Sequence, residues 1–100
     1  MTVNLEGRLD TMTAPGFGKQ METWIETGLE NFTIVCSQLD YISSAGLRAI
    51  LMVAKKLRGQ GGNLRLAALQ ESVQRVFTIS GFDKIIPIAQ TVDYTAKEKL

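Results

Sequence analysis

Two adjacent serines, Ser43 and Ser44, lie in the stretch DYISSAGLRAIL (residues 40–51), between an apolar strand-like run and an apolar helical run. A hydroxyl at the start of a helix has two uses. It accepts a backbone N–H as a cap, or it carries a phosphoryl group, which adds ~1.5–2 negative charges where the helix favours an anion. The fold should tolerate that charge, whereas a protein partner lying flat on this corner would be repelled. The pair therefore predicts either a structural cap or a phosphorylation switch.

Gly46 distinguishes these two interpretations. Neither serine forms a capping box, because the residues three positions further on are Gly46 and Leu47. A glycine in the first turn weakens the helix by about 1 kcal/mol relative to alanine. Its missing side chain is useful where another surface approaches the backbone closely. The glycine thus favours the second interpretation, in which a partner protein contacts the start of the helix.

The composition excludes several function classes. The chain has no histidine, which removes Ser-His-Asp and Cys-His hydrolytic sites and the commonest zinc sites, and one cysteine, Cys36, which leaves no internal disulfide. The net charge is +1 with dispersed basic residues, so no nucleic-acid footprint is visible. The N-terminus lacks a signal-peptide pattern, and the longest apolar run, 49–54, is too short to span a bilayer. We expect a cytoplasmic protein without a cofactor, metal, nucleic-acid or membrane partner, or small-molecule substrate.

The periodicity of apolar residues predicts one α/β domain over residues 1–100, with a largely parallel sheet. Residues 32–37 (FTIVCS) are apolar and β-branched, which is typical of a central strand covered on both faces. The other expected elements are strands near 3–5, 64–69 and 85–88, and helices near 14–28, 44–58, 73–81 and 91–99. Residues 40–46 should then lie beyond the carboxyl end of the central strand, where open α/β sheets present their sites.

The stretch LDYISSAGLRAIL (39–51) resembles the signature of the STAS domain, the family of bacterial anti-sigma factor antagonists and of the cytosolic domains of sulphate transporters. Three further stretches resemble family elements in the same order: LEGRLDTMTA (5–14), GQGGNLRLAAL (59–69) and RVFTISGFDKIIPI (75–88). The resemblance implies the STAS fold, a small, mostly parallel or mixed sheet of about four strands packed by about four helices. It also implies that the first family strand is short or missing here.

The resemblance implies a phosphorylatable antagonist that binds an anti-sigma factor serine kinase when unmodified. The family's acceptor lies two residues before the signature glycine, which here is Ser44, with Ser43 as the runner-up. Ser43 occupies a position that is often aspartate in the antagonists, and Asp10 corresponds to an acidic residue close to the acceptor. The kinase would supply ATP and magnesium, and a serine phosphatase would reset the switch. The expected partner-binding residues are Asp10, Thr11, Tyr41, Ser43, Ala45, Gly46, Arg48 and Met52.

Several alternatives stay open at this point. Asp10 could be an exposed turn residue, and Tyr41 could pack at the strand end or face a partner. The off-stripe side chains of the second helix form either a solvated face or a docking surface: Arg48, Met52, Lys55 and Lys56. The chain could also be a non-switching STAS scaffold or regulatory module. An enzyme with Ser44 as nucleophile would lack the usual base.

Overall fold

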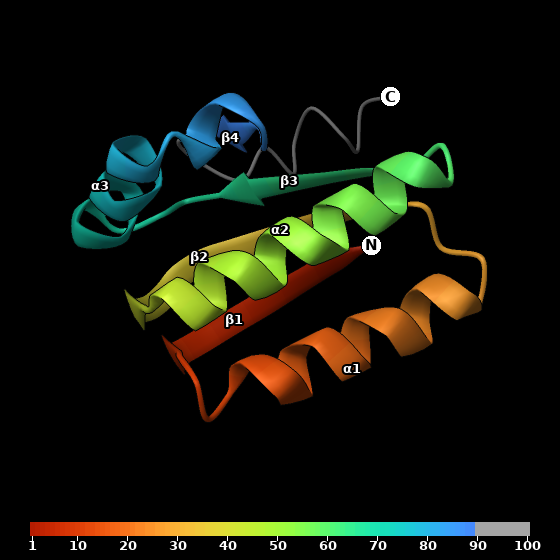
Figure 1. The fold of residues 1–100 in the computed structure, drawn as a ribbon, viewed down its shortest axis with the longest axis horizontal. Helices are drawn as coiled ribbons and strands as arrows, with labels where there is room; N and C mark the ends of the chain where they lie inside the picture. The colour runs from red at the N-terminus through yellow and green to blue at the C-terminus, as the bar shows by residue number, and fades with distance from the viewer. Residues whose placement is uncertain (90–100) are drawn as a thin grey trace.

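A computed structural model describes residues 1–89 and shows a four-stranded sheet with helices packed against it (Figure 1). The strand order is β1-β2-β3-β4 and every pairing is parallel. The predicted α/β fold with a largely parallel sheet is therefore confirmed. The predicted helix at 91–99 lies outside the described residues. In chain order the elements are β1 (Thr2–Leu9), α1 (Ala14–Glu26), β2 (Asn31–Ile42), α2 (Ser44–Gly59), β3 (Asn63–Ala67), α3 (Glu71–Ser80), a 3-10 turn (Phe82–Lys84) and β4 (Ile88–Ala89).

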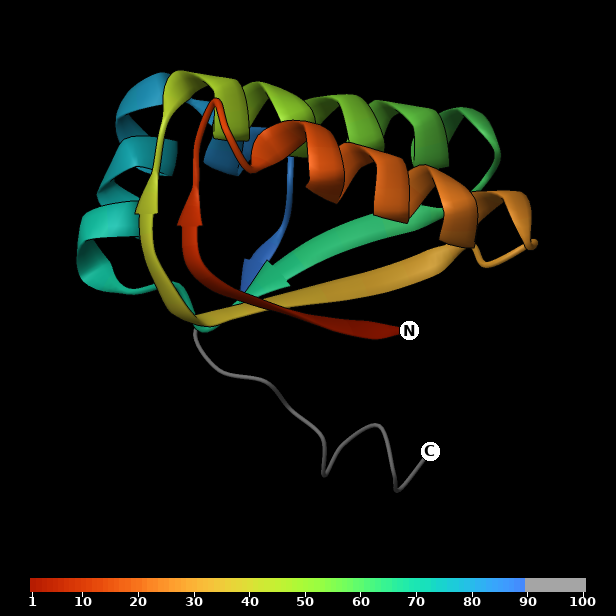
Figure 2. The ribbon, with the colours of Figure 1, turned by 90° about the horizontal axis from the view of Figure 1, so that it is seen from below.

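The core lies between the sheet and helices α1 and α2, which cover the same face of the sheet (Figure 2). β2 contributes alternate side chains to this face, because successive residues of a strand point to opposite sides. Phe32, Ile34 and Cys36 are all buried there. Burial raises the pKa of the Cys36 thiol to about 12, which leaves it protonated and unreactive at neutral pH.

β2 is longer than the predicted strand at 32–37 and continues to Ile42. The expectation that residues 40–42 lie beyond the strand is therefore wrong. Its second half pairs with the end of β1, up to Leu9 with Ile42, after two shifts in register. Only Leu39 and Ile42 are buried in this half. The other side chains of this half are exposed, so its sequence lacks the continuous apolar run that marked the first half.

β1 spans eight residues and forms an edge of the described sheet (Figure 1). It extends beyond the predicted strand at 3–5 because it pairs with β2 along most of its length. β1 is the first element of the described residues, and the expectation of a short or missing first family strand stays a prediction.

Ala68, directly after β3, is the only non-glycine residue with a positive φ in the described part of the chain, at 60°. The left-handed conformation costs an L-residue about 1–2 kcal/mol, and glycine adopts it freely. We expect Ala68→Gly to raise the free energy of unfolding by about 0.5–1 kcal/mol, because added entropy of the unfolded chain offsets part of the relief. Urea titration would measure this. The buried neighbour is the control: Ala67→Gly should destabilise the fold, and the same sign for both variants would contradict the argument.

Candidate functional site

The carboxyl ends of β1 and β2 meet at one edge of the sheet. Leu9 pairs with Ile42, and the backbone N–H of Ser43 donates to the carbonyl of Leu9 at 2.9 Å. Asp10 and the serine pair each follow directly after these joined strand ends. The structure therefore brings the predicted acceptor region and the predicted acidic residue to the same edge, where parallel sheets present their sites.

The two serines have different positions at the start of α2. Ser43 is the N-cap: its backbone is extended (ψ 176°) and its hydroxyl accepts the N–H of Gly46 at 3.2 Å. Ser44 is the first helical residue and is exposed. Among the side-chain hydrogen bonds of residues 1–89, none involves the Ser44 hydroxyl. The cap thus engages one hydroxyl and leaves the other facing solvent, as modification of Ser44 requires.

Gly46 serves the interior of the domain, which corrects the prediction that it makes room for a partner. It is buried, and a Cβ built on it would collide with the backbone carbonyl of Leu9 and lie 2.9 Å from the Ile42 side chain. The first turn of α2 can rest on the end of β1 only because this side chain is missing. The close approach expected of Gly46 is therefore made within the chain, and its role in partner binding stays a prediction without this support.

Asp10 organises the turn between β1 and α1. Its Oδ1 accepts the backbone N–H groups of Met12 (3.0 Å) and Thr13 (3.2 Å), and its own N–H donates to the Thr13 hydroxyl at 2.8 Å. That hydroxyl donates in turn to the Arg8 carbonyl at 2.8 Å. Partial desolvation raises the pKa of Asp10, but the hydrogen bonds from Thr13 and Met12 outweigh it, so the pKa lies below its ordinary value. Asp10 thus stabilises the turn and also lies at the sheet edge where the predicted acceptor, Ser44, follows β2.

This turn predicts a specific pH dependence. A carboxyl group whose pKa is lower in the folded chain stabilises the fold above its unfolded pKa of ~3.9, and that contribution is lost as the pH falls through the folded value. We expect Asp10→Asn to be less stable than the wild type at pH 7, and the difference to shrink as the pH falls below about 4. Thermal unfolding at a series of pH values would test this. A difference that is constant across the series would show that the ionised carboxylate contributes nothing.

Arg8 and Tyr41 form a pair beside Asp10. The Arg8 guanidinium lies 4.2 Å from the centroid of the Tyr41 ring, and its Nε is 3.4 Å from Asp10 Oδ2. Tyr41 remains 42% exposed, so its ring stacks on Arg8 and still faces solvent. Sequence reasoning missed Arg8, whose partner Tyr41 is distant in the chain and becomes a neighbour only through the pairing of β1 with β2.

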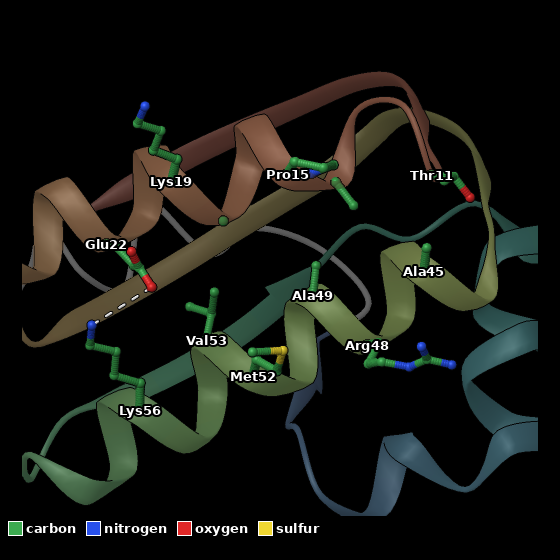
Figure 3. Close-up of a pocket in the computed structure, with 12 residues that line it drawn as sticks. Thr11, Pro15, Lys19, Glu22, Ala45, Arg48, Ala49, Met52, Val53 and Lys56 are labelled. Atoms are coloured by element: carbon green, nitrogen blue, oxygen red, sulfur yellow. Dashed lines mark ion pairs between the residues drawn. The ribbon is translucent and has the colours of Figure 1, made fainter.

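A groove of about 660 Å³ runs between α1 and α2 (Figure 3). Four of the predicted partner-binding residues line it: Thr11, Ala45, Arg48 and Met52. Its other wall comes from α1, where Ala14, Pro15 and Gly18 leave space by their small size. Sequence analysis missed this wall, because the spacing of two helices cannot be read from either helix alone.

Charged side chains stand along the same groove. Lys19, Glu22, Arg48 and Lys56 all line it. Glu22 and Lys56 form an ion pair across it at 3.9 Å (Figure 3). With this pair neutralised, Lys19 and Arg48 leave the groove with a positive character.

The predicted partner-binding residues therefore fall into two adjoining sets. Asp10, Tyr41 and Ser43 lie at the sheet edge and do not line the groove. Thr11 and Ala45 join the two sets, because Thr11 follows Asp10 and Ala45 follows Ser44. Ser44 thus lies at the boundary between the sheet edge and the groove.

Two further features concern the described part of the chain. No group of three or more histidine, cysteine, aspartate or glutamate side chains in residues 1–89 is arranged to hold a metal ion. Within the same residues, no helix has both the length and the apolar character needed to traverse a bilayer.

Comparison with known proteins identifies the family of this chain. The STAS domain family matches residues 1–95. BtrV of Bordetella bronchiseptica is 38% identical over 92 residues, covering 92% of this chain and 79% of that protein. The anti-sigma-B factor antagonist of Bacillus subtilis is 32% identical over 87 residues, covering 87% and 79%.

Solved structures share the fold. The Bacillus cell fate determinant SpoIIAA in its phosphorylated form superposes with a TM-score of 0.74 at 19% identity, covering 98% of this chain and 87% of that one. Its unphosphorylated form gives a TM-score of 0.76 at 17% identity, covering 98% and 86%. The family match and the sequence relatives together are decisive: the chain belongs to the STAS domain family.

Proposed function

We propose that this protein is an anti-sigma factor antagonist in a partner-switching system. When unmodified it binds an anti-sigma factor that is a serine kinase, and phosphorylation of Ser44 ends that interaction. The proposal depends on the different positions of the two serines. Ser43 caps α2, and the Ser44 hydroxyl is exposed beside the groove. The anti-sigma-B factor antagonist among the relatives supports the role, and SpoIIAA, which exists in a phosphorylated form, supports the modification.

The chemistry is a phosphoryl transfer carried out by the partner. The Ser44 oxygen attacks the γ-phosphorus of ATP, the bond to the β-phosphate oxygen breaks, ADP leaves, and the hydroxyl proton passes to a base of the kinase. Nucleotide and magnesium belong to the kinase. A serine phosphatase restores the hydroxyl by hydrolysis and releases inorganic phosphate.

The position of Ser44 makes the modification compatible with the fold. Phosphate adds ~1.5–2 negative charges, and the first turn of α2 favours an anion through its dipole and unpaired N–H groups. A partner seated on the sheet edge and groove would have to bury this charge, which is costly without a matching cation. The domain would therefore stay folded while its affinity for the partner falls.

Ser43 departs from the aspartate often found at this position in the antagonists. Serine and aspartate are both strong N-cap residues, so the helix start is retained here, as the hydrogen bond from Gly46 illustrates. What the substitution removes is a carboxylate beside the acceptor. This favours a second candidate function, a non-switching STAS module in which kinase recognition has been lost.

Phosphate mapping separates the two candidates. The protein would be incubated with the anti-sigma kinase of its own genome and Mg-ATP, and the modified residue identified by mass spectrometry. We expect phosphate on Ser44 and none on a Ser44→Ala variant. Modification at another residue, or none with an active kinase, would reject the switching function.

Met52 offers a test of the docking surface. It lines the groove and is 66% exposed, so a change there should leave the fold intact. We expect Met52→Glu to weaken binding to the anti-sigma kinase by about 10-fold, because an apolar contact is lost and a charge is buried. Ile79 on α3 is 80% exposed and outside the groove, which makes Ile79→Glu the matched control. Calorimetric titration showing equal loss for both variants would place the partner elsewhere.

A further inference from the structure

Arg48 lies one helical turn after Ser44 on the same face of α2. Residues four apart on a helix are neighbours, and an anion placed N-terminal to a cation at this spacing is the favourable order. Ser44 and Arg48 are both exposed. Neither pairs with another charged or polar side chain within the described residues, whereas Lys56, further along the same groove, is paired with Glu22.

The direction of the Arg48 side chain suits this spacing. Helical side chains lean towards the N-terminus of their helix, and Figure 3 shows Arg48 extending towards the end of α2 where Ala45 lies, away from Lys56. The side chain therefore extends towards the start of α2, the direction that a pair with residue 44 needs. The rest of that turn contains no acidic residue that would compete for it.

We propose that Arg48 is an internal latch for the phosphate on Ser44, pairing with it within the same helix. The inference rests on the proposed function, which supplies the phosphate on Ser44. It adds the residue of this chain that contacts the phosphate. Guanidinium binds phosphate oxygens with two parallel N–H donors, which favours this pair over a simple point-charge contact.

The latch would give phosphorylation two effects on the docking surface. The phosphate places negative charge at the boundary of the sheet edge and the groove. It also pairs the Arg48 guanidinium, so that this cation of a groove-lining residue is no longer free to contact a partner. Lys19 would then be the groove's one cation, among its described lining residues, that is not engaged in a pair. An acidic partner segment that fits the unmodified groove would lose a contact and gain a repulsion from a single chemical event.

The experiment uses protein in which phosphoserine is incorporated at position 44 during synthesis, so that no kinase is needed. The second ionisation of the phosphate, near pH 6 when unperturbed, would be followed by ³¹P NMR. An adjacent cation favours the dianion, so we expect this pKa to be lower in the wild-type chain than in Arg48→Gln by ~0.3 units or more. The control Lys55→Gln removes an exposed cation of α2 that lies outside the groove, and should leave the pKa unchanged. Equal values in wild type and Arg48→Gln would overturn the latch.

A second measurement needs no substitution. The Nε–H resonance of Arg48 should shift when position 44 carries phosphoserine in place of serine, and the shift should shrink at high salt. An unmoved resonance would also reject the proposal. Because the phosphate is installed during synthesis, a failed latch says nothing against the kinase, and a failed kinase assay says nothing against the latch.

Discussion

Gly46→Ala is expected to lower the free energy of unfolding by about 2–3 kcal/mol. The new Cβ would collide with the Leu9 carbonyl and lie 2.9 Å from the Ile42 side chain. The carbonyl cannot move freely, because it accepts the N–H of Ser43 and Leu9 is paired with Ile42. Either the helix start shifts or the strand ends separate. The cost of such overpacking exceeds the gain of about 1 kcal/mol that alanine normally brings to a helix.

Gly16 provides the matched control for this substitution. It is the third residue of α1, as Gly46 is the third residue of α2, but a Cβ at Gly16 would meet nothing within 4 Å. Gly16→Ala should therefore stabilise the protein, by up to about 1 kcal/mol. Chemical denaturation of both variants gives the comparison. If Gly46→Ala were as stable as Gly16→Ala, the contact between α2 and the end of β1 would not hold the edge together.

The same contact shows which surface approaches Gly46, a point that the sequence alone could not decide. A glycine in a first turn indicates a close approach of some kind, and this much could be predicted. Whether the approaching surface belongs to a partner or to the chain itself depends on where Leu9 lies. That position follows from the parallel pairing of β1 with β2, between residues some 30 apart in the chain. The residues around Gly46 in the sequence therefore do not indicate that Leu9 lies next to it.

The helices were predictable for a physical reason. Leu47, Ile50 and Leu57 recur at helical spacing and are all buried in α2, so burial on one face left a clear trace in the sequence. The second half of β2 left no such trace. Gln38, Asp40 and Tyr41 are exposed there, and the segment is a strand because β1 supplies its hydrogen bonds. Hydrogen bonding by a distant segment is invisible to a periodicity argument.

The groove belongs to the same class of feature. Arg48 and Met52 could be recognised as off-stripe residues, but their opposite wall could not. It depends on Ala14 and Gly18, whose small size becomes meaningful only once α1 is packed beside α2. Sequence analysis thus found one wall of the groove, on α2, and the residue Ser44 that precedes it.

The serine pair leads to the second large effect, a separation of stability from binding. Ser43→Ala removes the hydroxyl that accepts the Gly46 N–H, and should cost about 1 kcal/mol of stability while leaving the Ser44 hydroxyl in place. Ser44→Asp puts a carboxylate in the first turn, where it should stabilise α2 by about 0.3–1 kcal/mol. The same charge should weaken binding to the anti-sigma kinase by about 100-fold or more, because desolvating it against a partner costs several kcal/mol and an exposed pair with Arg48 returns only about 0.2–0.5 kcal/mol.

Ser44→Asp is informative because its expected effects on stability and on partner affinity have opposite signs. A general disturbance of the corner would reduce stability and binding together, whereas a charge at an exposed helix start should raise one and lower the other. Calorimetry of unfolding and titration with the anti-sigma kinase would measure both quantities on the same three proteins. Wild-type affinity in Ser44→Asp would favour the non-switching module instead. A Ser44→Asp protein less stable than wild type would mean that the first turn of α2 does not accept an anion, and phosphorylation there could not leave the domain intact.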